Sequence, residues 1–451
     1  MTESQIEQYA LDILANLGWQ ILHGPDIGPD GAAVERELRQ VILPGRLYDA
    51  LARLNPHIPE SALKEAMRRL VQISKPSLVE NNHDFHQLLV AGVPVQYRTS
   101  SGELKHDIVR VVDFTSPKNN DFAAVNQLTV LQGDYNRRPD IVLFVNGLPL
   151  VVIELKNAAD AKADLVAAYQ QIQTYKREIS DLFRFNELCV TSDGLEAEMG
   201  TITSPLERMM PWKTIDGEKE VGNVPMLEVL LRGACTPERL LDMVQNFIVF
   251  ERSDGDKLIK KAAAYHQYWV VNKALGRTLT ASSERGDQRA GVVWHTQGSG
   301  KSLSMVFYTG KLMKSRNLHN PTIVVVTDRN DLDGQLFGTF SACRELLGED
   351  PKQADSRSEL RKLLQRQAGG IIFTTIQKFS PEDDEDKLPV LTDRRNVIVM
   401  ADEAHRSQYG LKAHVRASDA QLVYGYAKYM RDALPGASYI GFTGTPIETD
   451  D

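Results

Sequence analysis

The chain has 451 residues, of which 42% are hydrophobic and 25% are charged, and its formal net charge is −8. These values are typical of a soluble globular protein with several domains, and they exclude a wholly basic protein that coats nucleic acid, although they allow a local basic groove. The three cysteines, Cys189, Cys235 and Cys343, include no C-x-x-C pair, which argues against a disulfide framework and a zinc site and is typical of a reducing compartment.

The N-terminal residues predict an amphipathic helix and no targeting segment. Residues 4–17 place apolar side chains at helical spacing, and Gly18 ends the pattern. The first residues are acidic and lack the basic and then apolar pattern of a signal peptide, and no apolar run approaches the length that spans a membrane. The sequence therefore predicts a cytoplasmic protein without a membrane partner.

Hydrophobic periodicity divides the rest of the chain into regions. Short strands dominate from about residue 106 to 155 and helix returns at residues 160–183, whereas residues 212–223 are polar and rich in turns. From about residue 257 onward, short apolar strands alternate with helical segments, which is typical of a parallel sheet with crossover helices. We expect an α/β protein with a first domain, a helical connector and a second domain at residues 1–225, 226–260 and 261–451.

The stretch PDIVLFVNGLPLVVIELKN, residues 139–157, places charged side chains at the ends of two apolar runs. The Asn-Gly pair between the runs predicts a hairpin, and Glu154 and Lys156 project from one face of its second strand. A regular hairpin with a two-residue loop sets Asp140 opposite Ile153, on the wrong face, whereas a three-residue loop or a bulge brings it to the face of Glu154. Shared chemistry of the two carboxylates therefore predicts the longer loop or a bulge.

Two carboxylates that converge in this way repel each other unless a divalent cation lies between them. Mg²⁺ prefers oxygen ligands, and a water molecule bound to it becomes acidic enough to attack a phosphodiester. Lys156 would orient that water or stabilise the charge that develops on the phosphate. The alternative is that Glu154 and Lys156 form an ion pair at a sheet edge while Asp140 caps the end of a strand.

The residues RRPD…IELK resemble the signature of the PD-(D/E)xK nucleases, which fold as a mixed sheet flanked by helices. The resemblance implies that Asp140 and Glu154 bind the metal together with the carbonyl group of Leu155, and that Lys156 is catalytic. It also implies an acidic metal ligand on the N-terminal helix, for which Glu7 is the candidate, although a solvated Glu7 is the alternative.

Gln171 and Tyr175 lie four residues apart on the following predicted helix, and so they share one face of it. The pair resembles the Q-x-x-x-Y motif of RecB-like nucleases, which implies that both side chains lie beside the DNA. Tyr175 also belongs to the apolar face of this helix, so packing alone is the alternative explanation.

The segment VVWHTQGSGKSL places a glycine-rich loop between a predicted strand and a predicted helix. Its glycines let backbone N–H groups face phosphate oxygens, Lys301 can reach the β- and γ-phosphates, and Ser302 can ligate Mg²⁺. His295 replaces the first glycine of the strict G-x-x-x-x-G-K-[ST] pattern, and a glycine loop formed by chance is the alternative. The residues expected to bind ATP here are Gly298, Ser299, Gly300, Lys301 and Ser302.

The segment NVIVMADEAHRS delivers Asp402 and Glu403 to the carboxyl end of an apolar strand, where open α/β sheets bind ligands. Asp402 is placed to hold Mg²⁺ through water, and Glu403 is placed to polarise the attacking water. The alternative is a charged helix start, in which both acids interact favourably with the helix dipole. Together with the glycine-rich loop, this segment resembles the RecA-like P-loop domain of superfamily 2 helicases and translocases.

Further segments resemble motifs of that superfamily. TDRNDLDGQ and TTIQKF resemble elements that contact the nucleic-acid backbone, which makes Arg329 and Lys378 candidates for phosphate contacts. GFTGTP, residues 441–446, resembles the motif that couples the nucleotide state to DNA binding. Gln267 within AYHQY resembles an element that reads adenine, whereas a packed Tyr-Gln-Tyr helix face is the alternative.

A RecB-like nuclease domain followed by such a motor domain resembles the N-terminal part of the restriction subunit of type I restriction-modification enzymes. The resemblance implies an ATP-dependent endonuclease that uses Mg²⁺ and ATP, translocates and cleaves double-stranded DNA, and assembles with methyltransferase and specificity subunits. The Q-x-x-G-R-x-x-R element of a second RecA-like domain is not found before Asp451, so we expect weak ATP binding and little hydrolysis by this chain. The alternatives are a nuclease-helicase of DNA repair and a nucleotide-binding interaction module without activity of its own.

Overall fold

The chain divides into two compact units, Met1–Tyr265 and His266–Asp451. The first unit includes residues 226–260, which the sequence predicted as a connector between domains. No helix in the described part of the chain is long and apolar enough to span a membrane. The computed structural model describes residues 2–157, 165–253, 255–327, 334–380, 389–402, 414–415, 422–423 and 426–445.

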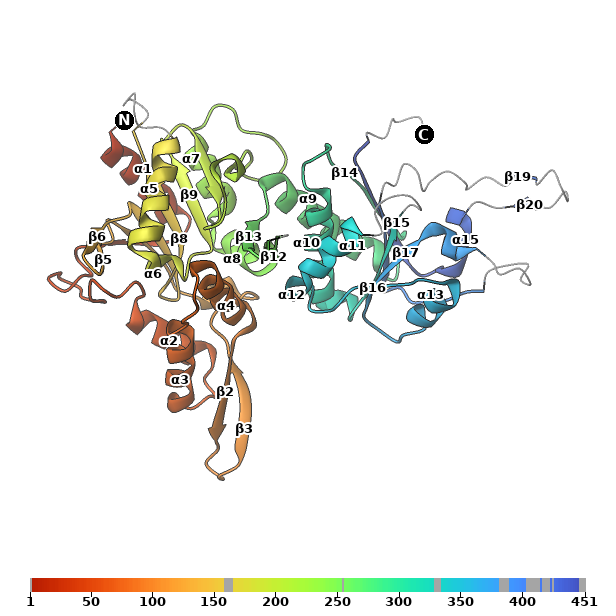
Figure 1. Ribbon diagram of the computed structural model, residues 1–451, viewed down its shortest axis with the longest axis horizontal. Coiled ribbons are helices and arrows are strands. Elements are labelled where there is room, and N and C mark those ends of the chain that lie inside the picture. The colour runs from red at the N-terminus through yellow and green to blue at the C-terminus, as the bar shows by residue number, and fades with distance from the viewer. Residues whose placement is uncertain are drawn as a thin grey trace. The chain divides into compact units, whose positions relative to one another are not determined.

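A mixed seven-stranded sheet forms the centre of the first unit (Figure 1). Strand β1 pairs with β4, and β8 pairs with β9, in parallel, whereas the other neighbours are antiparallel. Every residue of β7 and β8 is buried, which explains why both strands are almost continuous apolar runs. In order across the sheet, the strands are β1 (Gln20–His23), β4 (Phe122–Asn126), β7 (Ile141–Val145), β8 (Leu148–Leu155), β9 (Leu188–Ser192), β10 (Ala197–Gly200) and β11 (Met210–Pro211).

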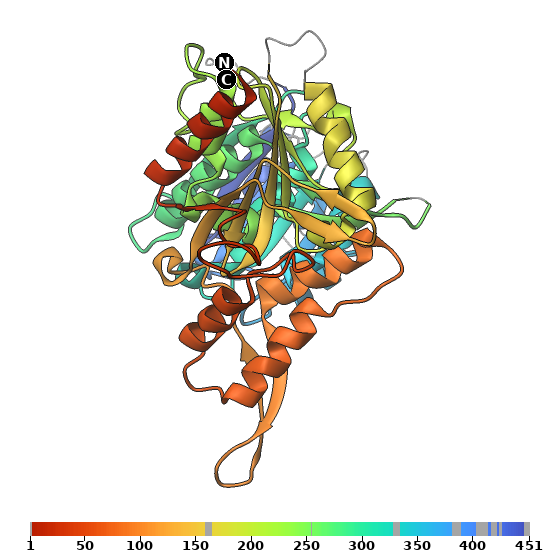
Figure 2. The same cartoon turned by 90° about the vertical axis from the view of Figure 1, so that its left-hand side faces the viewer.

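Two long helices flank this sheet, one on either side (Figure 2). Helix α1 (Glu3–Asn16) packs against β1, β4 and β8, and α5 (Leu165–Glu178) packs against β8 and β9. The start of α1 is a capping box, in which Thr2 and Gln5 each accept a hydrogen bond from the other's backbone N–H. Gly18, with a φ of +95°, follows its end. The predicted N-terminal helix is therefore confirmed.

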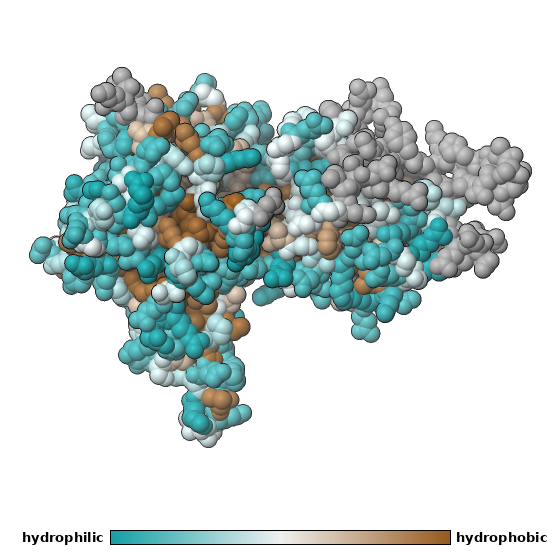
Figure 3. Space-filling model, viewed as in Figure 1, coloured by the Kyte–Doolittle hydropathy of each residue, from teal (hydrophilic) through white to brown (hydrophobic). Residues whose placement is uncertain are grey.

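Further elements of the first unit are four helices and two two-stranded ribbons, β2 with β3 and β5 with β6. The ribbon of β2 and β3 projects away from the rest of this unit (Figures 1 and 2), and α3 packs against β2. Leu104 and Ile108 are each more than half exposed on its outward face, and Figure 3 shows hydrophobic residues near its tip. The elements are α2 (Pro44–Leu54), α3 (Glu60–Val71), α4 (Leu78–Ala91), β2 (Val93–Arg98), β3 (Leu104–Val109), β5 (Val130–Gln132), β6 (Tyr135–Arg137) and α6 (Ser180–Phe183).

Residues 226–262 pack within the first unit and are not helical throughout. They form α7 (Met226–Ala234), α8 (Pro237–Asn246) and a hairpin of β12 (Ile248–Arg252) and β13 (Leu258–Ala262). The Tyr9 hydroxyl of α1 donates a hydrogen bond to Glu228, and Trp19 Nε1 donates to the carbonyl oxygen of Cys235 at 2.9 Å. These contacts tie the segment to the N-terminal helix, which sequence periodicity alone did not indicate.

The β7–β8 hairpin combines a tight turn with a bulge. Asn146 and Gly147 form the two-residue turn, with φ values of +51° and +77° that suit a type I′ hairpin. Phe144 pairs with Pro149 but Leu143 pairs with Val151, so Leu150 is the extra residue of a β-bulge. Beyond the bulge Ile141 pairs with Ile153, and the continued register sets Asp140 opposite Glu154. Of the two arrangements predicted from the sequence, the structure has the bulge.

The second unit contains a six-stranded parallel sheet with crossover helices, as the alternating pattern predicted. Its strand order is β14 (Arg289–Trp294), β21 (Ser438–Thr443), β18 (Val397–Asp402), β15 (Thr322–Thr327), β17 (Ile371–Thr375) and β16 (Lys352–Gln353). The other described elements are α9 (Tyr265–Ser282), α10 (Lys301–Lys314), α11 (Gln335–Ala342), α12 (Arg344–Leu347), α13 (Arg357–Leu364), α15 (Tyr426–Ala433), the 3-10 turn η4 (Ile376–Phe379) and the pair β19 (His414–Val415) and β20 (Leu422–Val423). The predicted class, a mixed-sheet α/β domain followed by a parallel α/β domain, is confirmed.

Candidate active site

The side chains predicted to take part in nuclease chemistry line a single cavity of about 770 Å³ in the first unit. The cavity lies where the first turns of α1 meet α5 and the ends of β4, β7 and β8. The predicted residues that line it are Glu7, Asp140, Glu154, Lys156, Gln171 and Tyr175. The sequence did not single out the other lining residues, which are Glu3, Ser4, Gln8, His23, Asn126, Gln127 and Arg138.

Asp140 and Glu154 are both buried, with 8% and 2% of their surface exposed. The Oδ2 atom of Asp140 accepts a hydrogen bond of 2.7 Å from the N–H group of Leu155, so the facing strand fixes this carboxylate. Lys156 Nζ donates to Oε1 of Glu154 at 2.7 Å and to the carbonyl oxygen of Leu155 at 2.9 Å. The second oxygen of Glu154, Oε2, is buried and has no hydrogen-bond partner among the described residues.

The three ionisable groups influence one another strongly because they share a buried site. Burial raises the pKa of Glu154 to about 8, and the charge of Asp140 adds to the rise. Burial raises the pKa of Asp140 to about 6, against the hydrogen bond from Leu155. Burial is the largest influence on Lys156 and lowers its pKa, but Glu154, Asp140 and Glu3 together outweigh it and leave this pKa raised. The site therefore favours a positive charge between its oxygens.

The arrangement of these oxygens fits a hard divalent cation. Asp140 and Glu154 supply carboxylates, the Leu155 carbonyl oxygen already faces the Lys156 ammonium, and the unpartnered Oε2 of Glu154 is an acceptor that a cation would satisfy. Among the described residues, no group of three or more His, Cys, Asp or Glu side chains could hold a metal. A cation here would therefore complete its ligand set with the Leu155 carbonyl and water.

Glu7 lines the cavity, but amide groups already hold both of its oxygens. Asn126 Nδ2 donates to Oε1 at 2.6 Å and Gln127 Nε2 donates to Oε2 at 2.5 Å. Gln127 adopts a left-handed backbone with a φ of +53°, and a Cβ atom on Gly24 would lie 2.4 Å from its carbonyl oxygen. The sequence analysis did not predict the two hydrogen bonds that Asn126 and Gln127 donate to Glu7. Gly24 is the sequence feature related to them, because a side chain at this position would collide with Gln127.

Gln171 and Tyr175 project from α5 into the same cavity. Tyr175 is only 4% exposed, and its hydroxyl, which lies near Glu154, donates to the carbonyl oxygen of Arg138 at 3.4 Å. This tyrosine is therefore buried in the apolar face of the helix and also lines the cavity. The two readings that the sequence left open do not exclude each other.

The glycine-rich loop of the second unit lies between β14 and α10, as predicted. Gly298 and Gly300 have φ values of +79° and +86°, and a Cβ atom on Gly300 would lie 2.6 Å from Nε2 of Gln267. Gln267 Nε2 donates to the carbonyl oxygen of Gly300 at 3.0 Å, and His266 Nε2 lies 3.0 Å from that of Ser299. The buried Gln267 amide thus contacts the loop itself, which the adenine-reading hypothesis did not foresee.

The residues expected to bind phosphates and Mg²⁺ meet at the carboxyl end of the parallel sheet. Lys301 Nζ forms an ion pair of 2.8 Å with Oδ1 of Asp402, the last residue of β18. Ser302 lies in the first turn of α10, directly after Lys301. Burial and the neighbouring side chains of His266 and Lys301 lower the pKa of His295 to about 4, which keeps its ring neutral beside the loop.

Some of the predicted motor residues are placed differently or lie elsewhere. Glu403 and Arg329 lie outside the described residues. Lys378, on η4, donates a hydrogen bond to the carbonyl oxygen of Ala354, so its ammonium is engaged within the fold. A phosphate contact by Lys378 would replace this hydrogen bond.

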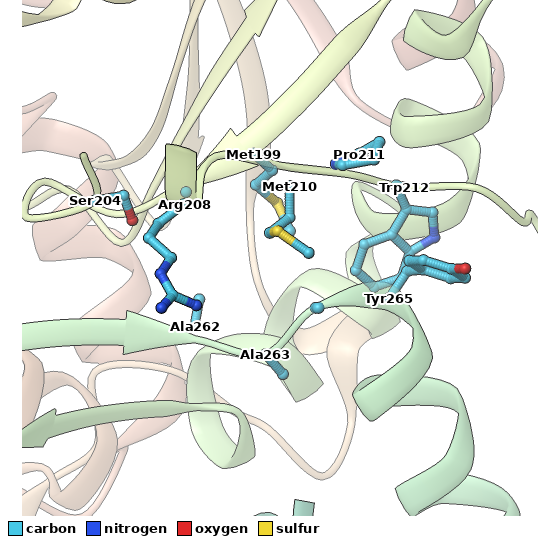
Figure 4. A pocket seen from close by; sticks show the side chains of 11 residues that line it. Met199, Ser204, Arg208, Met210, Pro211, Trp212, Ala262, Ala263 and Tyr265 are labelled. Carbon is cyan, nitrogen blue, oxygen red and sulfur yellow. The ribbon is translucent and has the colours of Figure 1, made fainter. Parts of the chain in front are cut away.

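A second cavity of the first unit, about 30 Å³ in volume, lies beside β10, β11 and the end of β13 (Figure 4). Met199, Arg208, Trp212 and Tyr265 are among the residues that line it. It has room for about two water molecules, and we assign no ligand to it.

Two family models match the chain. Residues 1–208 match the model described as type I restriction enzyme R protein N terminus, and residues 266–451 match that of the SWI2/SNF2 ATPase. The first match lies within the mixed-sheet unit, which extends to Tyr265, and the second match covers the parallel-sheet unit.

Named relatives agree with these matches. The chain is 48% identical to the type I restriction enzyme HindI endonuclease subunit of Haemophilus influenzae, over 100% of the chain and 43% of the relative. It is 33% identical to the putative type I restriction enzyme MjaIXP endonuclease subunit of Methanocaldococcus jannaschii, over 99% of the chain and 42% of the relative. It is 27% identical to the SauCOLORF180P endonuclease subunit of Staphylococcus aureus, over 85% and 37%. The chain spans less than half the length of these relatives.

Proposed function

We propose that the chain supplies the DNA-cleaving site and an ATP-binding motor domain of a type I restriction endonuclease, because residues 1–208 match the model of type I restriction enzyme R protein N termini and residues 266–451 match that of the SWI2/SNF2 ATPases. The proposed substrate is double-stranded DNA, the cofactors are Mg²⁺ and ATP, and the partners are methyltransferase and specificity subunits. The observation that carries the proposal is the convergence of six predicted side chains on one cavity.

In the nuclease site, we assign the metal to Asp140, Glu154 and the carbonyl group of Leu155. A bound Mg²⁺ would supply an acidified water molecule and neutralise charge on the phosphate. Lys156, hydrogen-bonded to two of the same oxygens, is placed to hold that charge or orient the water. Glu7 is proposed to bind the metal through a water molecule, because both of its carboxylate oxygens already accept hydrogen bonds from amide groups.

The charge of the cavity supports a role for a cation in DNA binding. Four acidic side chains line it, Glu3, Glu7, Asp140 and Glu154, against two basic ones, Lys156 and Arg138, so acids outnumber bases even when Glu154 is protonated. A phosphodiester would be repelled by this excess of negative charge unless a divalent cation offsets it. Gln171 and Tyr175 are the proposed neutral contacts to the DNA at the same cavity.

In the motor domain, the proposed nucleotide site comprises the loop from Gly298 to Gly300 with Lys301 and Ser302. Lys301 would exchange its ion pair with Asp402 for the nucleotide phosphates, which frees Asp402 to hold Mg²⁺ through water. Glu403 remains the proposed water-polarising residue. Arg329 and Lys378 remain the proposed contacts to the DNA backbone.

Nicking of supercoiled plasmid in the presence of Mg²⁺ tests the nuclease assignment. The assay uses the chain together with its methyltransferase and specificity subunits, with and without ATP. Asp140→Ala and Lys156→Ala are expected to abolish nicking, whereas Lys64→Ala, which removes an exposed lysine on α3, is the matched control. Unchanged nicking in the Asp140 and Lys156 variants would refute the assignment.

A further inference from the structure

A fully buried lysine joins the last hairpin of the first unit to the central sheet. Lys260 lies on β13, and its side chain is 0% exposed. Its ammonium donates to Oε2 of Glu187 at 2.7 Å, to the carbonyl oxygen of Asn186 at 2.9 Å and to Oδ1 of Asn82 at 2.9 Å. An ammonium has three donors, and all three are used here, which is the condition for burying such a charge.

The backbone of Lys260 is fixed as firmly as its side chain. The hydroxyl groups of Thr201 and Thr203 donate to its carbonyl oxygen at 2.8 Å and 2.6 Å, and its N–H group donates to the Thr203 hydroxyl at 2.9 Å. His86 Nδ1 lies 3.0 Å from the Glu187 oxygen that the ammonium contacts. Lys260 therefore anchors the hairpin of β12 and β13 through both its side chain and its backbone.

The residues held by Lys260 in turn hold the bulge of the nuclease hairpin. The N–H group of Glu187 donates to the carbonyl oxygen of Leu150 at 2.6 Å, and Asn186 Nδ2 lies 3.4 Å from the same oxygen. Leu150 is the bulge residue, unpaired with β7. Its carbonyl group thus finds partners just before β9, in the segment that contacts the buried ammonium.

We propose that Lys260 is a positioning residue for the nuclease site, an inference that rests on the proposed function. By holding Asn186 and Glu187, Lys260 stabilises the bulge at Leu150, and the bulge sets Asp140 opposite Glu154. Regular pairing would set Asp140 opposite Ile153 and separate the carboxylates. Lys260 does not line the cavity, so it acts through the alignment of two strands and not through contact with cation or DNA.

The test compares Lys260→Met with two controls. Lys261→Met makes the same chemical change at the next residue, whose ammonium pairs with Glu251 within the hairpin. Leu70→Ala destabilises the first unit from a buried position on α3, outside the central sheet and the β12–β13 hairpin. Two readouts apply at matched folded fractions: the affinity for Mn²⁺, measured by electron paramagnetic resonance, and the hydrogen exchange of peptides that cover residues 148–156.

Lys260→Met is expected to weaken Mn²⁺ binding about 10- to 100-fold, as for other residues that orient metal ligands, and to speed exchange in residues 148–156. Neither control should do so. If Lys260→Met does not fold, the double variant Lys260→Met with Glu187→Gln leaves no unpaired buried charge and is expected to show the same losses. The proposal would be overturned if Lys260→Met, or the double variant, had the same Mn²⁺ affinity and the same hydrogen exchange in residues 148–156 as Leu70→Ala.

The proposed function fails separately from this inference. If Asp140→Ala leaves Mn²⁺ binding unchanged, the metal assignment is wrong, and the exchange data alone decide whether Lys260 aligns the strands. If Asp140→Ala abolishes Mn²⁺ binding while Lys260→Met leaves affinity and exchange at the level of the controls, the nuclease assignment stands and the positioning role is wrong.

Discussion

Glu154→Gln is expected to stabilise the metal-free first unit, and to do so more strongly as the pH rises. Glu154 is 2% exposed, and burial raises its pKa from the ordinary 4.5 to about 8. The folded state therefore binds the proton more tightly than the unfolded chain does. The stability that comes from the protonated group is fully present below about pH 4.5 and is lost as the pH rises through 8.

The size of the effect follows from the shift in pKa. Each pKa unit corresponds to about 1.4 kcal/mol, so ionised Glu154 costs the fold roughly 4–5 kcal/mol above pH 8. Glutamine has the same shape and cannot ionise, so the variant avoids this cost. The gain in the free energy of unfolding should be small at pH 4 and reach several kcal/mol at pH 9.

The assay is urea unfolding in EDTA. Unfolding is monitored by the hydrogen exchange of peptides from β7 and β8, so that it reports on the first unit alone. Glu60→Gln, at an exposed position on α3, is the control and should show little change with pH. Mg²⁺ should cancel the advantage of Glu154→Gln, because a bound cation favours the ionised carboxylate. A difference between variant and parent that does not vary with pH, or a variant less stable at pH 9, would refute the reasoning.

The remaining predictions concern the loops. Lys301→Ala should abolish binding of a fluorescent ATP analogue while leaving Mn²⁺ binding in the first unit unchanged; loss of both would contradict separate sites. Gly300→Ala, with a Cβ atom 2.6 Å from a neighbouring amide and a φ of +86°, should weaken ATP binding at least tenfold, whereas Gly276→Ala, in open space on α9, should leave it intact and stabilise the helix by about 1 kcal/mol. Gly133→Ala should lower the free energy of unfolding by about 1–2 kcal/mol, because its backbone is left-handed. Gly147→Ala should lower it by more, because its Cβ would also lie 2.5 Å from a carbonyl oxygen. Equal losses in urea titrations of the two variants would contradict the role of this close approach.

Local patterns were enough to predict the elements that carry the site. The Asn-Gly pair predicted the β7–β8 hairpin, and its two positive φ values are those that the turn requires. Helical spacing predicted α1 and α5, and the apolar strands of the second unit predicted its parallel sheet. Each of these predictions depends on residues close together in the chain.

Long-range contacts decided what local patterns could not. The sequence left a longer loop and a bulge open, because the choice depends on partners of Leu150 that lie beyond the hairpin. A lysine such as Lys260 is expected to be exposed, because lysine side chains are rarely fully buried. Its burial becomes understandable only from the acceptor atoms of Asn82 and Glu187, which lie far away in the sequence.

The bulge at Leu150 also bears on how this site can be sought in other chains. A hairpin that lacks this one residue and pairs regularly would still place its two carboxylates side by side, because the bulge merely absorbs one unit of length. The number of residues between the aspartate and the glutamate must fit the pairing of the hairpin: one parity of that number needs a bulge, and the other needs regular pairing. A search for such sites that fixes the gap between aspartate and glutamate would therefore discard functional homologues that differ by a single insertion.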